Sequence, residues 1–272
     1  MGRQVTALPK PARSLAAKAA TALAAWYLLA PPSSLAGAAQ APPTTTHWPK
    51  VVQEAMAYVR PRAHVPLEAP RWLPSAGGVP NSAQAYAGQY YGVALYRCPA
   101  PLPVNSPGVG TGRCGAMASY YGYFQGHRYP TARTAVSALP NASASLAGCT
   151  RTARATLSPG VVAEVHSGGT GGGDCAVTWS HRGWQFQLTG DLGNGQGSGR
   201  AAPWHQVAAS ILGYLAHHAL PPGPGVLQCD MAGDGLHTGL YWVEGSDLYV
   251  ASAYHSALAA ISLAEAMAPY PG

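Results

Sequence analysis

Charged side chains are scarce in this sequence. Only 10% of its 272 residues are Asp, Glu, Lys or Arg, with 10 acids against 16 bases. Four of the bases and none of the acids lie in residues 1–41, so the remaining chain has 12 bases, 10 acids and a net charge of +2. Most of the excess of basic over acidic residues therefore lies in the amino-terminal segment, and we expect no nucleic-acid partner. A surface this poor in charge changes little on titration, which fits an acidic exterior.

Recognisable catalytic and metal-binding motifs are also absent. The sequence contains no C-x-x-C, H-E-x-x-H or G-x-S-x-G segment, which argues against a zinc site and a serine hydrolase elbow. Ser256 follows His255, but adjacent residues rarely point at one another, so the pair does not predict a nucleophile and its base. We expect no catalytic residue, cofactor or metal. The alternative is a secreted hydrolase whose histidines and carboxylates meet only in the folded chain. Its candidate histidines are His166, His181, His205, His237 and His255.

Phenylalanine is the rarest aromatic residue, with 2 Phe against 15 Tyr and 7 Trp. A core built by packing alone would use more Phe, so many of the rings should keep a polar edge toward solvent. Neighbouring strand residues point to opposite faces, so "QYYG" and "SYYGYF" should each leave a tyrosine outside or in a groove. Such rings stack on sugars, peptides or cell-wall polymer, unless tyrosine merely solubilises a charge-poor sheet. The candidate ligand-stacking residues are Tyr90, Tyr91, Tyr120, Tyr121 and Tyr123.

Residues 1–41 have the order of a secretory signal peptide. Four basic residues precede an apolar core at 20–30, which is followed by "PPSS" and a run of small residues. The core is shorter than the roughly twenty residues that a membrane-spanning helix needs. We therefore expect cleavage, secretion and no stable transmembrane anchor. The alternative is an extracellular domain tethered to the membrane by an uncleaved leader.

All five cysteines follow this leader, which fits an oxidising compartment. Proximity pairs Cys98 with Cys114 around a Pro/Gly-rich loop, where a disulfide would stabilise the fold by about 3 kcal/mol. It also pairs Cys149 with Cys175, although other connectivities are open to five cysteines. Cys229 is then left over. We expect it to be a buried free thiol, with an intermolecular or reactive thiol as the alternative.

The remaining pattern predicts an α+β fold of antiparallel sheets, each backed by a helix. Residues 42–83 predict a short helix and a Pro-rich extended segment. Three blocks of strands followed by a helix then cover residues 84–145, 146–220 and 221–272. The segments "CAVTWSHRGWQFQLTG" and "GLYWVEGSDLYVASAY" each place a short turn after a tryptophan, so Trp179 and Trp242 should anchor hairpins beneath helices. The blocks form a weak internal repeat in one or two compact domains.

These patterns together predict an exported binding, sensory or structural protein without enzymatic activity. Its expected partner is cell-wall polymer, a glycan or a peptide. Its oligomeric state does not follow from the sequence.

Overall fold

The computed structural model describes most of the chain after residue 46. The described residues are 47–74, 78–115, 119–141, 146, 149–168, 174–190, 192, 204–231, 236–254 and 256–271. All of them belong to one compact unit, Ala39–Gly272. The expected signal segment, residues 1–41, and His255 lie outside the described residues.

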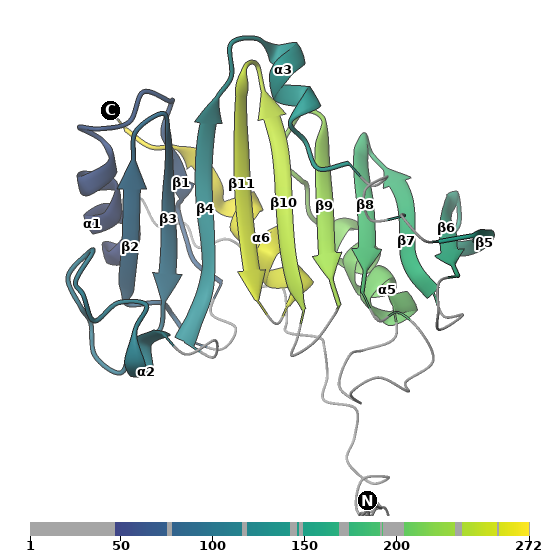
Figure 1. Cartoon of the computed structure of the whole chain (residues 1–272), viewed down its shortest axis with the longest axis horizontal. Helices are drawn as coiled ribbons and strands as arrows, with labels where there is room; N and C mark the ends of the chain where they lie inside the picture. The colour runs from purple at the N-terminus through teal and green to yellow at the C-terminus, as the bar shows by residue number, and fades with distance from the viewer. Residues whose placement is uncertain are drawn as a thin grey trace, which may run out of the picture. The chain divides into compact units, whose positions relative to one another are not determined.

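A ten-stranded mixed sheet forms the centre of the fold, in the order β2-β3-β4-β11-β10-β9-β8-β7-β6-β5 (Figure 1). Its first strands in the chain are β2 Ser82–Ala87, β3 Tyr90–Tyr96, β4 Tyr120–Arg128, β5 Arg151–Ser158 and β6 Val161–Ser167. The later ones are β7 Asp174–His181, β8 Trp184–Thr189, β9 Gly225–Asp230, β10 His237–Glu244 and β11 Asp247–Tyr254. The α+β class is confirmed. The expectation of separate antiparallel sheets was wrong, because strands of all three blocks share one sheet.

One pair of strands breaks the antiparallel pattern. The strands β8 and β9 run parallel, and the helix α5 Trp204–Leu215 lies between them in the chain. Short turns join β7 to β8 and β10 to β11, as the sequence predicts, and such turns force antiparallel pairing. The connection between β8 and β9 is much longer and permits a crossover to a parallel strand. The turn motifs in the two flanking hairpins therefore could not predict how β8 and β9 pair.

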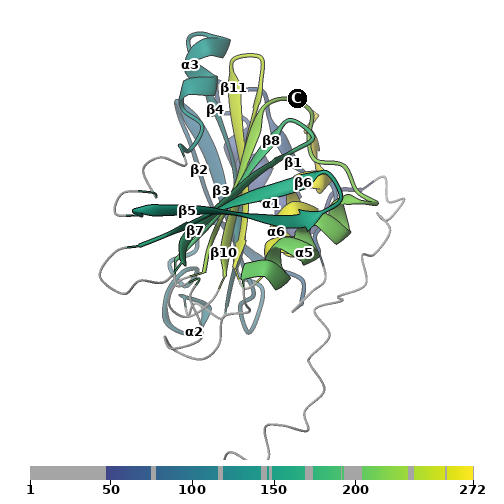
Figure 2. The same cartoon turned by 90° about the vertical axis from the view of Figure 1, so that its right-hand side faces the viewer.

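Three helices cover one face of the sheet: α1 Lys50–Val59, α5, and α6 Ala257–Ala266 (Figure 2). The apolar side of α1 buries Val52 and Met56 against β2 and β3. Trp179 and Trp242 are buried beneath the other two helices, so each tryptophan anchors its hairpin from below. A small ladder of β1 Glu68–Pro70 and β12 Met267–Pro269 contacts α6 in the same layer.

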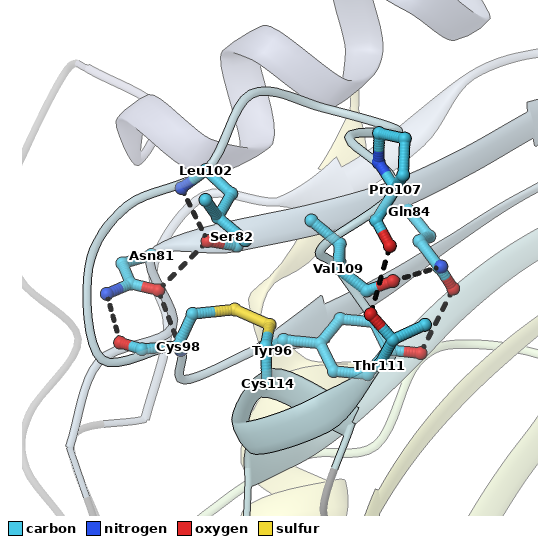
Figure 3. The surroundings of a disulfide bond; sticks show 10 residues. All are labelled: Asn81, Ser82, Gln84, Tyr96, Cys98, Leu102, Pro107, Val109, Thr111 and Cys114. Atoms are coloured by element: carbon cyan, nitrogen blue, oxygen red, sulfur yellow. Dashed lines mark hydrogen bonds between the residues drawn. A yellow bond between two sulfur atoms is a disulfide. The ribbon is translucent and has the colours of Figure 1, made fainter.

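The structure contains the disulfides Cys98–Cys114 and Cys149–Cys175, which is the pairing expected from proximity. The first closes a loop that includes the short helix α2 Gly112–Gly115 and covers the outer edge of β2 (Figure 3). Within this loop, Asn105 bonds to the main chain of β2 through its amide N–H and both polar atoms of its side chain. The loop therefore takes the place of a further strand and protects the sheet edge.

Among the residues that the structure describes, the opposite face of the sheet carries one short helix, α3 Ala132–Ser137. Thr131 caps its first turn by accepting a hydrogen bond from the Thr134 amide. Its buried Ala135 packs on Val243 and Leu248, at the turn end of the β10–β11 hairpin. Most of this face is therefore left without a covering helix among the described residues.

Candidate functional site

We call the sheet face opposite α1, α5 and α6 the open face. In β3, Tyr91 and Val93 are buried against the helices, so Tyr90 and Tyr96 point to the open face because strand side chains alternate. Residues that are paired across neighbouring strands point to the same face, so the register assigns the open-face residues of the other strands in turn. The open face is therefore rich in Tyr, His, Gln, Ser and Thr.

A first row of rings crosses the open face at one end of the strands. The ring centroids of Tyr86 and Tyr90 are 5.3 Å apart, and those of Tyr90 and His127 are 5.7 Å apart in a stacked arrangement. His127 in turn lies 4.3 Å from the Tyr129 ring, which packs beside α3. Tyr86 and Tyr90 are 44% and 43% exposed, so this row offers two accessible rings beside each other.

A second row crosses the open face near the other end of the same strands. Its ring centroids are separated by 5.4 Å between Tyr96 and Tyr120, 5.1 Å between Tyr120 and Tyr254, and 4.6 Å between Tyr254 and His237. Burial raises the pKa of the Tyr120 hydroxyl, and neighbouring tyrosines add to the effect. Burial also lowers the pKa of His237, despite the opposing influence of Asp230. Both groups are therefore neutral at pH 7.

Amide and hydroxyl side chains occupy the strip between the two rows, which we call the polar strip. Cross-strand register aligns its members from β2 to β7. They are Gln84, Tyr123, Gln125, Tyr241, Ser252, Gln228, Gln187, Gln185 and Thr178. Hydrogen bonds join neighbours along the strip, with Gln228 donating to Gln187 at 3.0 Å and the Tyr123 and Tyr241 hydroxyls bonded together. None of these side chains carries a formal charge.

Glycines in the middle of the strands let tyrosines lie low on the open face. The phenol end of Tyr86 lies across Gly92 on the neighbouring strand, and its hydroxyl donates to Gln125 one strand further on at 3.1 Å. Tyr241 similarly leans over Gly239, where a Cβ atom would lie 2.9 Å from the ring. A side chain at either glycine would push the ring outward, so these glycines shape a shallow surface.

The polar strip ends in a cavity of about 440 Å³ beneath the segment that follows α3. Leu139 and Pro140 form one wall, and Thr178, Gln185 and Gln187 form the other. Gln187 is only 1% exposed, and its side-chain oxygen accepts a hydrogen bond from Gln228, so it supports the cavity wall while Thr178 and Gln185 face the space. Apolar walls with a few amide groups are typical of a binding pocket.

The disulfide loop holds the other end of the polar strip in place (Figure 3). The Gln84 amide donates to the Val109 carbonyl at 2.8 Å, and the Tyr96 hydroxyl donates to the Gln84 side-chain oxygen at 3.2 Å. Asn81 bonds to both the amide and the carbonyl of Cys98. The loop thus orients one residue of the strip and one of the second row.

The structure separates the five tyrosines proposed for ligand stacking. Tyr90, Tyr120 and Tyr123 lie on the open face, the first of them exposed and the other two partly buried. Tyr91 and Tyr121 lie in the core, with hydroxyls that donate to the main-chain carbonyls of Glu68 and Pro74. These two rings are inaccessible to a ligand. Tyr121 reaches the core because the register between β3 and β4 shifts beside it.

Sequence reasoning missed the tyrosines and amides that other strands bring to this face. Tyr86 lies beside Tyr90 through the local β2–β3 hairpin, whereas Tyr241 and Tyr254 join these rings only because β11 pairs with the distant β4. The single signal available was their position in strand-like segments with alternating polarity.

The candidate histidines do not converge on one site. His166 and His237 lie on the open face but in β6 and β10, with their ring nitrogens bonded to threonine or serine hydroxyls. His181 lies on the helix side, and His205 lies in the first turn of α5. Within the described part of the chain, no group of three His, Cys, Asp or Glu side chains is placed to hold a metal ion.

Ser256 and Cys229 have structural roles. The Ser256 hydroxyl caps α6 by accepting a hydrogen bond from the Ala259 amide. Cys229 is a buried free thiol, and burial raises its pKa to about 11. A thiol in this state is a poor nucleophile at neutral pH.

Comparison with protein-family models, curated proteins and solved structures finds no match for this chain. None of the helices in the described residues has both the length and the apolar character to cross a membrane. The function of the protein is therefore inferred from its fold and its open face.

Proposed function

We propose that this protein is exported and binds an extended, uncharged polysaccharide across the strands of its open face, without enzymatic activity. The observation that supports it is the pair of aromatic rows on either side of the polar strip. Rings stack on the apolar faces of sugars, while amides and hydroxyls bond to sugar hydroxyls. The strip runs between the two rows, so an extended chain lying along it would meet amides and hydroxyls beneath it and rings beside it over β2, β3, β4, β11 and β10.

The absence of charge along the polar strip favours a neutral ligand. A charged polymer would need paired charges on the protein to offset its lost hydration. The strip from Gln84 to Thr178 has amides and hydroxyls, with Val250 and Val226 between them and with Ser252 and Gln187 buried. Eight strands, β2 to β7 in sheet order, lie under this strip. At about 4.8 Å between strands they span about 34 Å, which is long enough for several linked sugars.

Binding to a panel of neutral and charged cell-wall polysaccharides, measured by calorimetry on the secreted protein, tests the proposal. Each stacked ring contributes about 0.5 to 1.5 kcal/mol. The variant Tyr86→Ala/Tyr90→Ala should therefore lose about tenfold in affinity for the neutral ligand.

Tyr58→Ala is the matched control, because Tyr58 lies on α1 away from the open face. It should bind like the original protein, and thermal unfolding should show that both variants are folded. Unchanged affinity of the Tyr86/Tyr90 variant would contradict the proposal, as would preferential binding of peptides or charged polymers that this variant weakens.

Export and lack of catalysis need separate measurements. Amino-terminal sequencing of protein from the culture medium should find a start after the small residues near 36–41. A bound oligosaccharide should keep its mass on long incubation, whereas shortened products would support a hydrolase.

A further inference from the structure

A second cavity, of about 190 Å³, lies on the helix-covered side of the sheet, away from the open face. It forms between the β7–β8 turn and the segment that follows α5. His181 and Arg182 line it from the turn, and His218 lines it from the other segment. Trp184 and Leu215 provide apolar walls. Three side chains that carry or can acquire positive charge thus surround a small space.

His218 is held in a fixed orientation beside this cavity. Its Nδ1 atom lies 2.9 Å from a Glu265 carboxylate oxygen, and its ring stacks on Tyr214 at 3.9 Å between centroids. The Tyr214 hydroxyl donates to the other oxygen of Glu265 at 2.8 Å. Because the carboxylate accepts the Nδ1 proton, Nε2 is the ring nitrogen left to face another partner.

Arg182 is also positioned by the fold. It occupies the turn with a φ of 50°, and its guanidinium donates to the Leu215 carbonyl at 2.8 Å. This bond satisfies a carbonyl at the negative end of α5, which would otherwise repel an anion. A guanidinium has five N–H donors, so others remain for a ligand.

We propose that this cavity binds a small oxyanion, such as a sulfate or a carboxylate group, held by His181, Arg182 and His218. The ionisable groups facing the cavity are these three and, behind His218, Glu265 and Tyr214. The Glu265 carboxylate accepts hydrogen bonds from Tyr214 and His218, so its oxygens are turned toward those two side chains. Burial, and then the neighbouring Arg182, lower the pKa of His181. This imidazole therefore adds a donor and a positive charge to the cavity only in acid, which couples anion binding to acidity.

Sulfate is the first probe, because its charge does not change between pH 5.5 and 7.5. Calorimetric titration of the full chain should show about tenfold tighter binding at pH 5.5 if one imidazole must be protonated. A glucuronate oligosaccharide is the second probe, and it distinguishes a carboxylate carried by a polymer from a free anion.

Arg182→Gln and His181→Gln should each weaken binding of the active probe at least fivefold at pH 5.5. His205→Gln is the control, since His205 is an exposed histidine on α5 outside the cavity. Thermal unfolding reports whether each variant folds. Binding of either probe with this pH and variant dependence supports the site. Binding of neither, equal affinity at both pH values, or equal losses in the control overturns it.

Discussion

The phenol ring of Tyr86 lies across Gly92, the residue opposite it on β3, and reaches Gln125 on the strand beyond. A methyl group at position 92 would collide with the phenol oxygen. The absence of a side chain at one residue thus determines where a ring of the first aromatic row lies.

Gly92→Ala should displace Tyr86 and break its bond to Gln125. We expect a loss of about 1 to 3 kcal/mol in the free energy of unfolding, as for other overpacked sites, and weaker ligand binding. In a Tyr86→Ala background the same substitution should cost far less, because the colliding ring is gone. Urea unfolding of the single and double variants measures this coupling. Additive losses would show that the ring does not occupy this position.

Removing the Cys98–Cys114 disulfide should destabilise the fold and disturb the open face together. The bridge spans 16 residues, so Cys98→Ser/Cys114→Ser should lose about 3 kcal/mol. Affinity for the ligand should also fall, because the loop orients Gln84 and Tyr96. Cys149→Ser/Cys175→Ser is the matched control. It should lose stability with a smaller loss of affinity, since Cys149 and Cys175 are not hydrogen-bond partners of Gln84 or Tyr96 and adjoin the polar strip only through Thr178 on β7.

Asn105 should protect the edge of β2 from pairing with other molecules. It has a φ of 61°, a left-handed backbone conformation that asparagine and glycine tolerate, and it makes three hydrogen bonds to β2. Asn105→Gly keeps the backbone conformation and loses the side-chain bonds, whereas Asn105→Ala loses both. We expect aggregation during storage, measured by light scattering, to increase in the order original, Gly, Ala. Equal aggregation of all three would show that the loop does not protect this edge.

Glu68 should make the protein more stable in mildly acidic solution. Burial raises its pKa from 4.5 to about 7, with further contributions from Glu244 and Asp247. The native state therefore holds a proton between pH 4.5 and 7 that the unfolded chain has released. The free energy of unfolding must fall as the pH rises through this window.

The expected fall is about 1 to 3 kcal/mol, and Glu68→Gln should remove most of it. Urea unfolding at several pH values checks the slope. Glu54→Gln is the control, because Glu54 is an exposed partner of Lys50, and it should leave the slope unchanged. A slope that persists in Glu68→Gln would assign it to another group.

The local elements of this fold could be predicted from the sequence, whereas their assembly could not. Trp179 and Trp242 mark their hairpins because a short turn determines the pairing of the strands it joins. No such local rule joins β4 to β11, in which Arg128 and Asp247 meet across the sheet at 2.8 Å. The parallel pair β8–β9 is equally non-local.

The candidate site depends on these non-local pairings. Adjacent tyrosines such as Tyr90 and Tyr91 predict that one ring points outward, but the pattern alone does not say which. The second aromatic row joins Tyr120 to Tyr254 across the β4–β11 boundary. Its existence therefore follows from register between distant segments, which alternation within one segment cannot determine.

The position of β11 beside β4 also constrains how the chain assembles during synthesis. The meander β2–β4 can form early, but its inner edge stays bare until the last strands of the chain have been made. Long-range pairing of this kind is slow and leaves an edge open to wrong partners in the meantime. A nascent chain that stops before residue 247 would therefore expose the unpaired edge of β4 to other molecules. Correct assembly of the sheet thus waits for the carboxyl-terminal β10–β11 hairpin.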